Sequence, residues 1–146
     1  MTRNDGGRTF AWALAVLLLA ANVAGYAFDL YAAYWWFDRV LHAATILAMT
    51  FWLAVIVFGE PFREGRNLLF VVLVASVGIA IGALWEVAEW IFDRFSSSDV
   101  IKGKDDTVID IVMDTVGAVI AALLALRYRL GAGRDAVPSG EPSRVR

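Results

Sequence analysis

The sequence predicts an all-α membrane protein, a four-helix transmembrane bundle with both termini in the cytoplasm. Two observations support this fold class. Hydrophobic residues make up 60% of the 146 residues and the mean hydropathy is +0.63, which is high for a soluble protein. In addition, four separate apolar segments reach the roughly 20 residues that a helix needs to cross about 30 Å of hydrocarbon.

The four predicted spans are residues 10–28, 40–58, 68–90 and 108–126. The third is almost free of polar side chains, whereas acidic residues interrupt the fourth. We expect residues 1–130 to form one membrane domain, with the first span retained, because its apolar run exceeds the 7 to 15 residues or so of a signal peptide. Residues 131–146 are rich in Gly, Pro, Ser and Arg, and this composition predicts a disordered cytoplasmic tail.

Lys and Arg flank the predicted spans unequally. Nine lie on the side of the N-terminus: Arg3, Arg8, Arg63, Arg66, Arg127, Arg129, Arg134, Arg144 and Arg146. Four lie on the other side: Arg39, Arg94, Lys102 and Lys104. Because basic residues favour the cytoplasmic side of a membrane, this asymmetry predicts that both termini are cytoplasmic.

Charge and cysteine content exclude several kinds of chemistry. The net charge is −2 and no long basic run is interleaved with aromatic residues, so we expect no nucleic-acid partner. The chain has no cysteine, which excludes disulfides, thiolate metal ligands and a cysteine nucleophile.

Ionisable residues gather at one end of the predicted bundle. Such residues stand at the start of the second span, at the end of the third and at the start of the fourth. In that order they are Asp38, Arg39 and His42; Glu86, Glu89 and Asp93; and Asp106, Asp110 and Asp114. With the predicted topology all three sets lie at the exoplasmic end. The acids recur at helical spacing on one stripe of each helix, so we expect them to face the interior of the bundle. Small residues on the same helices, Gly78, Gly82 and Gly117, predict close helix packing.

Acidic residues at membrane depth predict a functional site. Each costs about 2.5 to 3.5 kcal/mol on insertion scales, so protons or a cation must neutralise them. We expect a divalent cation bound by carboxylates, with Asp106 the weakest candidate: Glu86, Glu89, Asp110, Asp114 and Asp106. His42 would be a further ligand or a general base, oriented by Asp38. Oxygen-rich ligands favour Mg²⁺, Mn²⁺ or Ca²⁺ over Zn²⁺ or Fe²⁺. The alternative interpretation is helix pairing through shared protons.

Three motifs in order also resemble a known family. They are Asp38-Arg39-x-x-His42, Gly82-Ala83-Leu84-Trp85-Glu86-x-x-Glu89-Trp90, and Asp106-Thr107-x-x-Asp110-x-x-x-Asp114-Thr115-x-Gly117-Ala118. Together they resemble the YjdF-like family of small bacterial inner-membrane proteins, and more loosely VanZ-like proteins. The chain departs from these patterns at Ala43, where an aromatic residue is usual, and at Asp114, where VanZ-like proteins have asparagine. The resemblance implies a helical bundle in the bacterial inner membrane and indicates the site, but no reaction.

Three classes of function remain open from the sequence. The first is a membrane-embedded enzyme whose cation acts on a lipid or lipid-linked substrate near the bilayer surface. The second is a proton or ion translocator that uses the same acids as a relay, which would require homo-oligomeric assembly around a pore, because the cytoplasmic halves of the spans are almost free of polar residues. The third is an accessory subunit whose acids bind a basic segment of a partner.

Overall fold

The computed structural model describes residues 3–57, 66–96 and 100–135. These residues form five helices and no strand: α1 (Arg3–Ala27), α2 (Leu30–Ala33), α3 (Phe37–Ile56), α4 (Asn67–Phe95) and α5 (Lys104–Asp135). Among the described residues, four of these helices are long and apolar enough to cross a membrane: Arg8–Ala27, Phe37–Ile56, Asn67–Phe95 and Lys104–Gly131. The predicted all-α, four-helix transmembrane fold is therefore confirmed.

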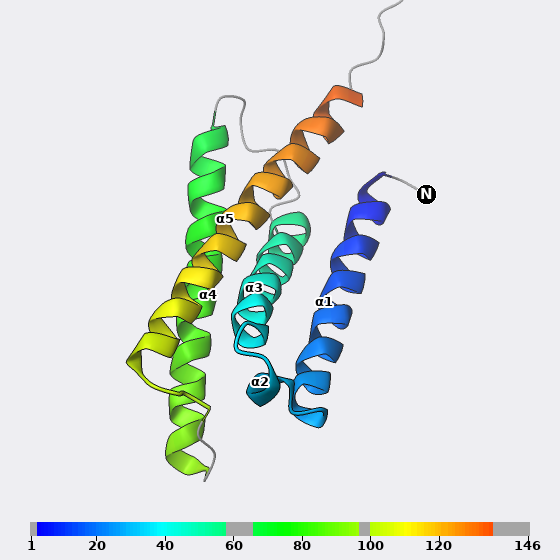
Figure 1. The fold of residues 1–146 in the computed structure, drawn as a ribbon. Helices are drawn as coiled ribbons and strands as arrows, with labels where there is room; N and C mark the ends of the chain where they lie inside the picture. Colours follow the sequence, from blue (N-terminus) through cyan, green and yellow to red (C-terminus); the bar gives the residue numbers. More distant parts are fainter. Residues whose placement is uncertain (1–2, 58–65, 97–99, 136–146) are drawn as a thin grey trace, which may run out of the picture.

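The four long helices run alternately up and down the molecule (Figure 1). One end carries the short helix α2, the ends of α1 and α4 and the starts of α3 and α5; we call this the α2 end. The start of α1 and the end of α5 lie at the opposite end. The predicted placement of both termini on the cytoplasmic side stays a prediction, as does the exoplasmic position of the α2 end.

The helices extend beyond the spans predicted from hydropathy. The predicted third span ended at residue 90 and the fourth began at residue 108, whereas α4 continues to Phe95 and α5 begins at Lys104. A hydropathy window marks the part of a helix that lipid solvates, while backbone hydrogen bonding continues into the polar interface. The helix α2 is too short for a periodic pattern and was not predicted.

The last helix also extends beyond the C-terminal boundary that the sequence predicted for the membrane domain. Helix α5 continues to Asp135, five residues into the segment 131–146 that was expected to be disordered. Gly131 and Gly133 lower helix propensity, yet the long preceding helix propagates through them because elongation of a formed helix costs little. The rest of the predicted tail, residues 136–146, and the predicted end of the second span at residue 58 lie outside the described residues.

Helix α3 is the centre of the bundle. It packs against α5, α4 and α1, and α4 also packs against α5. Toward the end opposite α2, these helices enclose an apolar core: Phe51, Ala54, Val55, Phe70, Val74, Ala75, Ala121, Ala122 and Ala125. The four alanines on α4 and α5 allow the helix axes to approach closely. Such close packing of small residues stabilises helix association in a bilayer, where the hydrophobic effect does not drive helices together.

Glycines make the closest helix contacts, as their spacing predicted. A side-chain carbon on Gly117 would overlap the backbone carbonyl of Ala43 in α3, and one on Gly78 would overlap the hydroxyl of Thr50. Both positions are buried. The predicted close approach is therefore confirmed, and it brings α5 and α4 directly onto the backbone and short side chains of α3.

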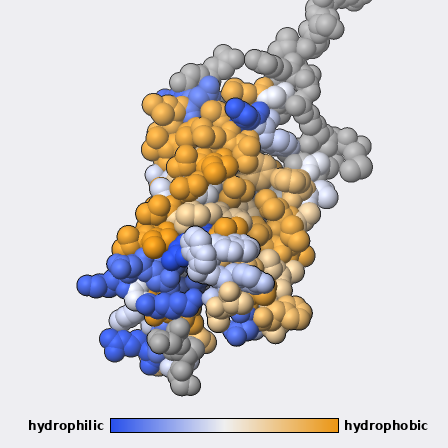
Figure 2. All heavy atoms as spheres, viewed as in Figure 1, coloured by the Kyte–Doolittle hydropathy of each residue, from blue (hydrophilic) through white to orange (hydrophobic). Residues whose placement is uncertain are grey.

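The exterior is that of a membrane protein. Figure 2 shows an apolar middle on the visible face and hydrophilic atoms at both ends, most extensively at the α2 end. Large aromatic side chains stand exposed there, such as Trp35 at 77% and Trp90 at 52%. The guanidinium of Arg39 lies 5.3 Å from the Trp35 ring centroid, and that of Arg94 lies 5.1 Å from the Trp90 ring centroid. Aromatic rings paired with cations are typical of the membrane interface.

Replacing Gly117 by valine tests the contact between α5 and α3. The new side chain would overlap the Ala43 carbonyl, so we expect the free energy of unfolding in mixed micelles to fall by about 1–3 kcal/mol. Val116→Ile is the matched control, because Val116 is 44% exposed and an added methyl group there would face lipid. An unfolding midpoint of Gly117→Val equal to that of the wild type would contradict the contact.

Single cysteines test the predicted orientation, since the chain contains no cysteine of its own. Lys104→Cys lies at the α2 end and is exposed, whereas Gly6→Cys lies at the other end with no neighbouring atom within 4 Å of its side-chain position. In intact bacterial spheroplasts, a membrane-impermeant maleimide should label Lys104→Cys at once and Gly6→Cys only after lysis. The reverse pattern would place the termini outside the cytoplasm.

Candidate functional site

His42 on α3 is the centre of the candidate site. Its side chain is 7% exposed, and its Nδ1 lies 3.2 Å from Oδ1 of Asp114 on α5 and 3.6 Å from Oε1 of Glu86 on α4. Its Nε2 lies 3.7 Å from Oδ1 of Asp38, one turn earlier on α3. One imidazole therefore faces carboxylates from three helices, including residues 72 positions apart in the sequence.

The carboxylates deepest in the bundle are buried and incompletely hydrogen bonded. Glu86 is 4% exposed, Asp110 3% and Asp114 1%. Each has one oxygen without a hydrogen-bond partner among the described residues, namely Glu86 Oε1, Asp110 Oδ1 and Asp114 Oδ2. Water cannot solvate such atoms in a packed bundle, so each needs a proton, an ion or an additional donor.

Gly82 sets the depth of Asp114. A side-chain carbon built on Gly82 would lie 2.5 Å from Oδ2 of Asp114, so only a glycine in α4 leaves room for the carboxylate of α5. The close approach predicted for Gly82 is thus confirmed, and it serves the site as well as the packing. With α4 at this distance, Asp114 is directed across the bundle toward His42.

Two groups of residues have the spacing of metal ligands. The first is Asp38, His42 and Asp110, and the second is His42, Glu86 and Glu89. Within each group the candidate ligand atoms all lie within 4.8 Å of one another. Both groups share His42, so they belong to one site. Asp114 is in neither group, but its Oδ1 lies 3.2 Å from Nδ1 of His42. We call these five residues and Asp114 the His42 cluster: Asp38, His42, Glu86, Glu89, Asp110 and Asp114.

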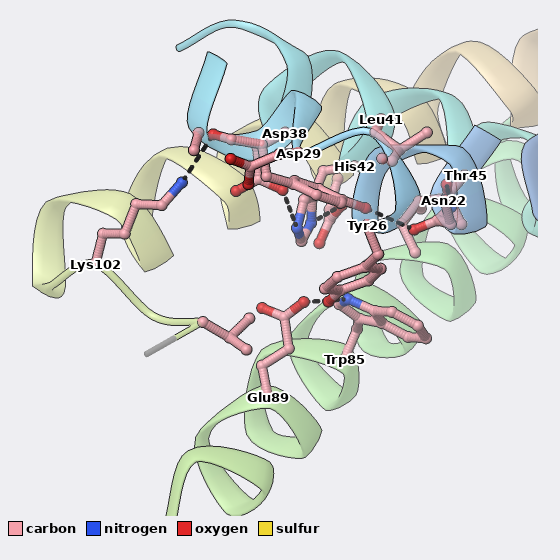
Figure 3. A pocket seen from close by; sticks show the side chains of 16 residues that line it. Asn22, Tyr26, Asp29, Asp38, Leu41, His42, Thr45, Trp85, Glu89 and Lys102 are labelled. Atoms are coloured by element: carbon pink, nitrogen blue, oxygen red, sulfur yellow. Dashed lines mark hydrogen bonds and ion pairs between the residues drawn. The ribbon is translucent and has the colours of Figure 1, made fainter. Parts of the chain in front are cut away.

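Glu89 lies at the edge of the His42 cluster. It is only half-buried, and its Oε1 accepts a 2.8 Å hydrogen bond from Nε1 of Trp85, as the dashed line in Figure 3 indicates. The bond fixes the glutamate one turn from Glu86 and on the same side of α4. Glu89 is thus held close to His42 while remaining accessible from outside the bundle.

Two acids from the predicted stripes accept hydrogen bonds from the backbone of the segment that connects α4 to α5. Asp93 accepts hydrogen bonds from the backbone nitrogens of Val100 and Ile101, both 2.9 Å long. Asp106, which we predicted as a weak metal ligand, accepts a 3.3 Å hydrogen bond from the backbone nitrogen of Lys102 and is in neither ligand group among the described residues. Its contact indicates a role at the start of α5.

A polar contact between α1 and α3 was not predicted. The Asn22 amide donates to the Leu18 carbonyl, 3.0 Å away, and to the Thr45 hydroxyl, 3.4 Å away, and its Oδ1 accepts from the Tyr31 hydroxyl at 3.2 Å. Burial raises the pKa of Tyr31, so the phenol stays protonated as a donor. In the sequence, the one sign of this contact is the polar side chain of Asn22 within the apolar first span, and the sequence does not indicate which residues it would contact.

This contact forms part of the wall of a pocket beside the His42 cluster. The pocket has a volume of about 260 Å³ and is lined by residues from four of the long helices, from α2 and from the segment before α5. Figure 3 shows His42, Asp38 and Glu89 around it, with Tyr26, Trp85 and Lys102 nearby. A preformed cavity thus gives access to the imidazole and to Asp38, Glu89 and Asp114, whereas Glu86 and Asp110 do not line it.

Comparison with known proteins supports the conclusion that this is a membrane protein but does not indicate a reaction. An uncharacterized protein of Thermotoga maritima is 25% identical over 111 residues, which cover 75% of this chain and 58% of that relative. The chain therefore spans less than two thirds of the length of this relative. No solved structure matches the chain.

Residues 6–131 match the family described as "Predicted membrane protein (DUF2238)". The match includes all four segments that could cross a membrane and every residue of the His42 cluster. The resemblance to YjdF-like proteins is consistent with it. The chain is therefore a multi-pass membrane protein that belongs to the DUF2238 family.

Proposed function

We propose that the His42 cluster binds a divalent cation, and that the protein is an enzyme of the bacterial inner membrane that acts on a lipid or lipid-linked substrate at the α2 end. One observation carries the proposal. Three buried carboxylates surround one histidine, and each has an oxygen without a hydrogen-bond partner among the described residues. Buried acids in this state are most simply neutralised by a cation that all of them share.

The spacing of the ligand atoms supports a cation. Oxygen ligands bind Mg²⁺, Mn²⁺ or Ca²⁺ at about 2.0–2.6 Å, so two ligands on opposite sides of one ion stand about 4–5 Å apart. The candidate atoms of each group lie within 4.8 Å of one another, with His42 common to both groups. Small side-chain rotations are enough to bring them onto an ion.

The charge balance supports the same conclusion. The His42 cluster holds five carboxylates and one imidazole, and three of the carboxylates, Glu86, Asp110 and Asp114, are buried. Each carboxylate at membrane depth costs about 2.5–3.5 kcal/mol, and one protonated histidine offsets only one of them. A divalent cation bound in place of that proton offsets two, because histidine ligates a metal in its neutral form, so fewer of the acids need to hold protons.

The donor set favours hard cations. Five of the six side chains offer oxygen, which suits Mg²⁺, Mn²⁺ or Ca²⁺, while the single imidazole also accommodates Zn²⁺ or Fe²⁺. Bound there, the cation would polarise a phosphoryl or carbonyl oxygen of the substrate or activate a water molecule. Asp38, which faces Nε2 of His42, is positioned to orient the imidazole.

A proton or ion translocator is the alternative function. The same unpartnered oxygens would then share protons, and the acids would exchange them with the pocket. The two functions differ in what they require of the protein. An enzyme of the proposed kind needs a bound metal, whereas a proton relay does not.

Metal content separates the two functions. We expect stoichiometric Mn²⁺ or Mg²⁺ in protein purified without chelator, measured by mass spectrometry, and its loss in an Asp110→Asn, Asp114→Asn double variant. These amides keep the side-chain volume but remove the negative charge that holds the ion.

Asp106→Asn is the matched control for the double variant, because it makes the same change on the same helix outside the His42 cluster, at a carboxylate that accepts a hydrogen bond from the Lys102 backbone. It should retain the metal. Absence of metal from the wild type after incubation with each cation would refute the cation proposal and favour shared protons.

Thermal unfolding gives a second test. A ligand that binds only the folded state stabilises it by about 2.7 kcal/mol at 100 times its Kd. Mn²⁺ should therefore raise the unfolding temperature of the wild type in detergent, and the shift should disappear in His42→Gln, which removes the residue common to both ligand groups. Equal shifts in both proteins would mean that Mn²⁺ binds elsewhere.

A further inference from the structure

The pocket beside the His42 cluster is elongated along α3. Its floor is one face of that helix, formed by Asp38, Leu41, His42, Thr45 and Ile46. The eight helical steps from the first to the last of these span about 12 Å of helix axis. A single ion needs far less length, whereas a lipid lies parallel to the helices that surround it and fills such a shape.

The walls of the pocket come from helices on two sides of α3. Helix α1 contributes Asn22, Gly25 and Tyr26, and α4 contributes Trp85 and Glu89. Both helices pack against α3, but among the described residues they make no extensive contact with each other. A molecule in the surrounding bilayer can therefore reach the floor sideways, between α1 and α4.

Polarity changes along the length of the pocket. Asp29, Asp38 and Lys102 line it toward the α2 end, where Figure 3 shows the lysine beside the short helix. Farther along α3, beyond His42 and Asp114, its lining carries no charge: Ile46 lies there with Thr45 and Asn22, whose polar groups are hydrogen-bonded to each other. The pocket thus matches an amphiphile whose polar head lies at the α2 end and whose apolar chain points toward the middle of the bundle.

Lys102 gives the head of the pocket a positive charge. Its Nζ donates a 3.4 Å hydrogen bond to the uncharged Tyr31 carbonyl. The carboxylates of Asp38, Glu89 and Asp114 line the same pocket and would repel an anion. A cation on the His42 cluster reverses that repulsion, so an anionic group fits only when the metal is bound.

We infer that the pocket binds a phosphate-bearing lipid, with its phosphate between the bound cation and Lys102 and its chain between α1 and α4. The inference rests on the proposed function and names the substrate class of the same site. Phosphate is the anion that divalent cations and lysine jointly bind in many proteins. The binding is therefore metal-dependent, lateral and directed by Lys102.

Binding measurements on the purified full chain in non-ionic detergent test this inference. The probes are short-chain phosphatidic acid, diacylglycerol with the same chains, and inorganic phosphate, each with Mn²⁺ and with EDTA. Phosphatidic acid should bind at least tenfold more tightly than either other probe in Mn²⁺, and EDTA should abolish the difference. Metal content is measured in the same samples.

Lys102→Gln tests the position of the phosphate. Loss of one charged hydrogen bond should weaken phosphatidic acid binding about tenfold and leave diacylglycerol binding and metal content unchanged. Lys104→Gln is the matched control, since it removes a lysine from the same end of α5 that does not line the pocket. It should bind phosphatidic acid as the wild type does.

Five outcomes would overturn the inference. If diacylglycerol bound as tightly as phosphatidic acid, the phosphate would not be recognised. If inorganic phosphate bound as tightly as phosphatidic acid, the lipid chain would not contribute to binding. Unchanged binding by Lys102→Gln would remove the lysine from the site. Bound metal without lipid binding would refute this inference alone, whereas absence of metal would refute the proposed function and this inference with it.

Discussion

The contact between His42 and Asp114 is the interaction on which the rest of the structure depends. It joins α3 to α5 inside the bundle, with 3.2 Å between Nδ1 and Oδ1 and with almost no exposure of either side chain. Removing one partner would leave the other buried without compensation, which costs several kcal/mol in comparable buried pairs. The position of α5 on α3 and the state of the His42 cluster are therefore determined together.

Packing and chemistry use the same small residues. Gly82 leaves room for the Asp114 carboxylate, and Gly117, nearly one turn farther along α5, lets the helix rest on the α3 backbone at Ala43. In lipid, such close contacts stabilise a bundle because apolar burial alone gains little. A larger residue at either glycine would displace α5, and with it the carboxylate that faces His42.

The sequence predicted the fold well and the site in part. Apolar length is sufficient to predict the four helices, and helical phase placed Glu86 and Asp114 on interior faces. Asp106 shares the phase of Asp114 but accepts a hydrogen bond from the Lys102 backbone, because it lies two turns closer to the end of the helix. Distances between helices, and the part that Asn22 of α1 takes in the pocket wall, depend on packing that no local pattern encodes.

The two halves of the bundle differ in a way that bears on function. Among the described residues, the buried polar side chains are His42, Thr50, Glu86, Asp110 and Asp114, and Thr50 alone lies beyond the His42 cluster toward the other end. Past it, Phe51 and Phe70 belong to an apolar core closed by alanines. A proton or ion that reached the acids would find no continuous row of buried polar side chains leading onward in the part of the chain that the structure describes. Exchange through the pocket at the α2 end is the open route, which favours a substrate that both enters and leaves there.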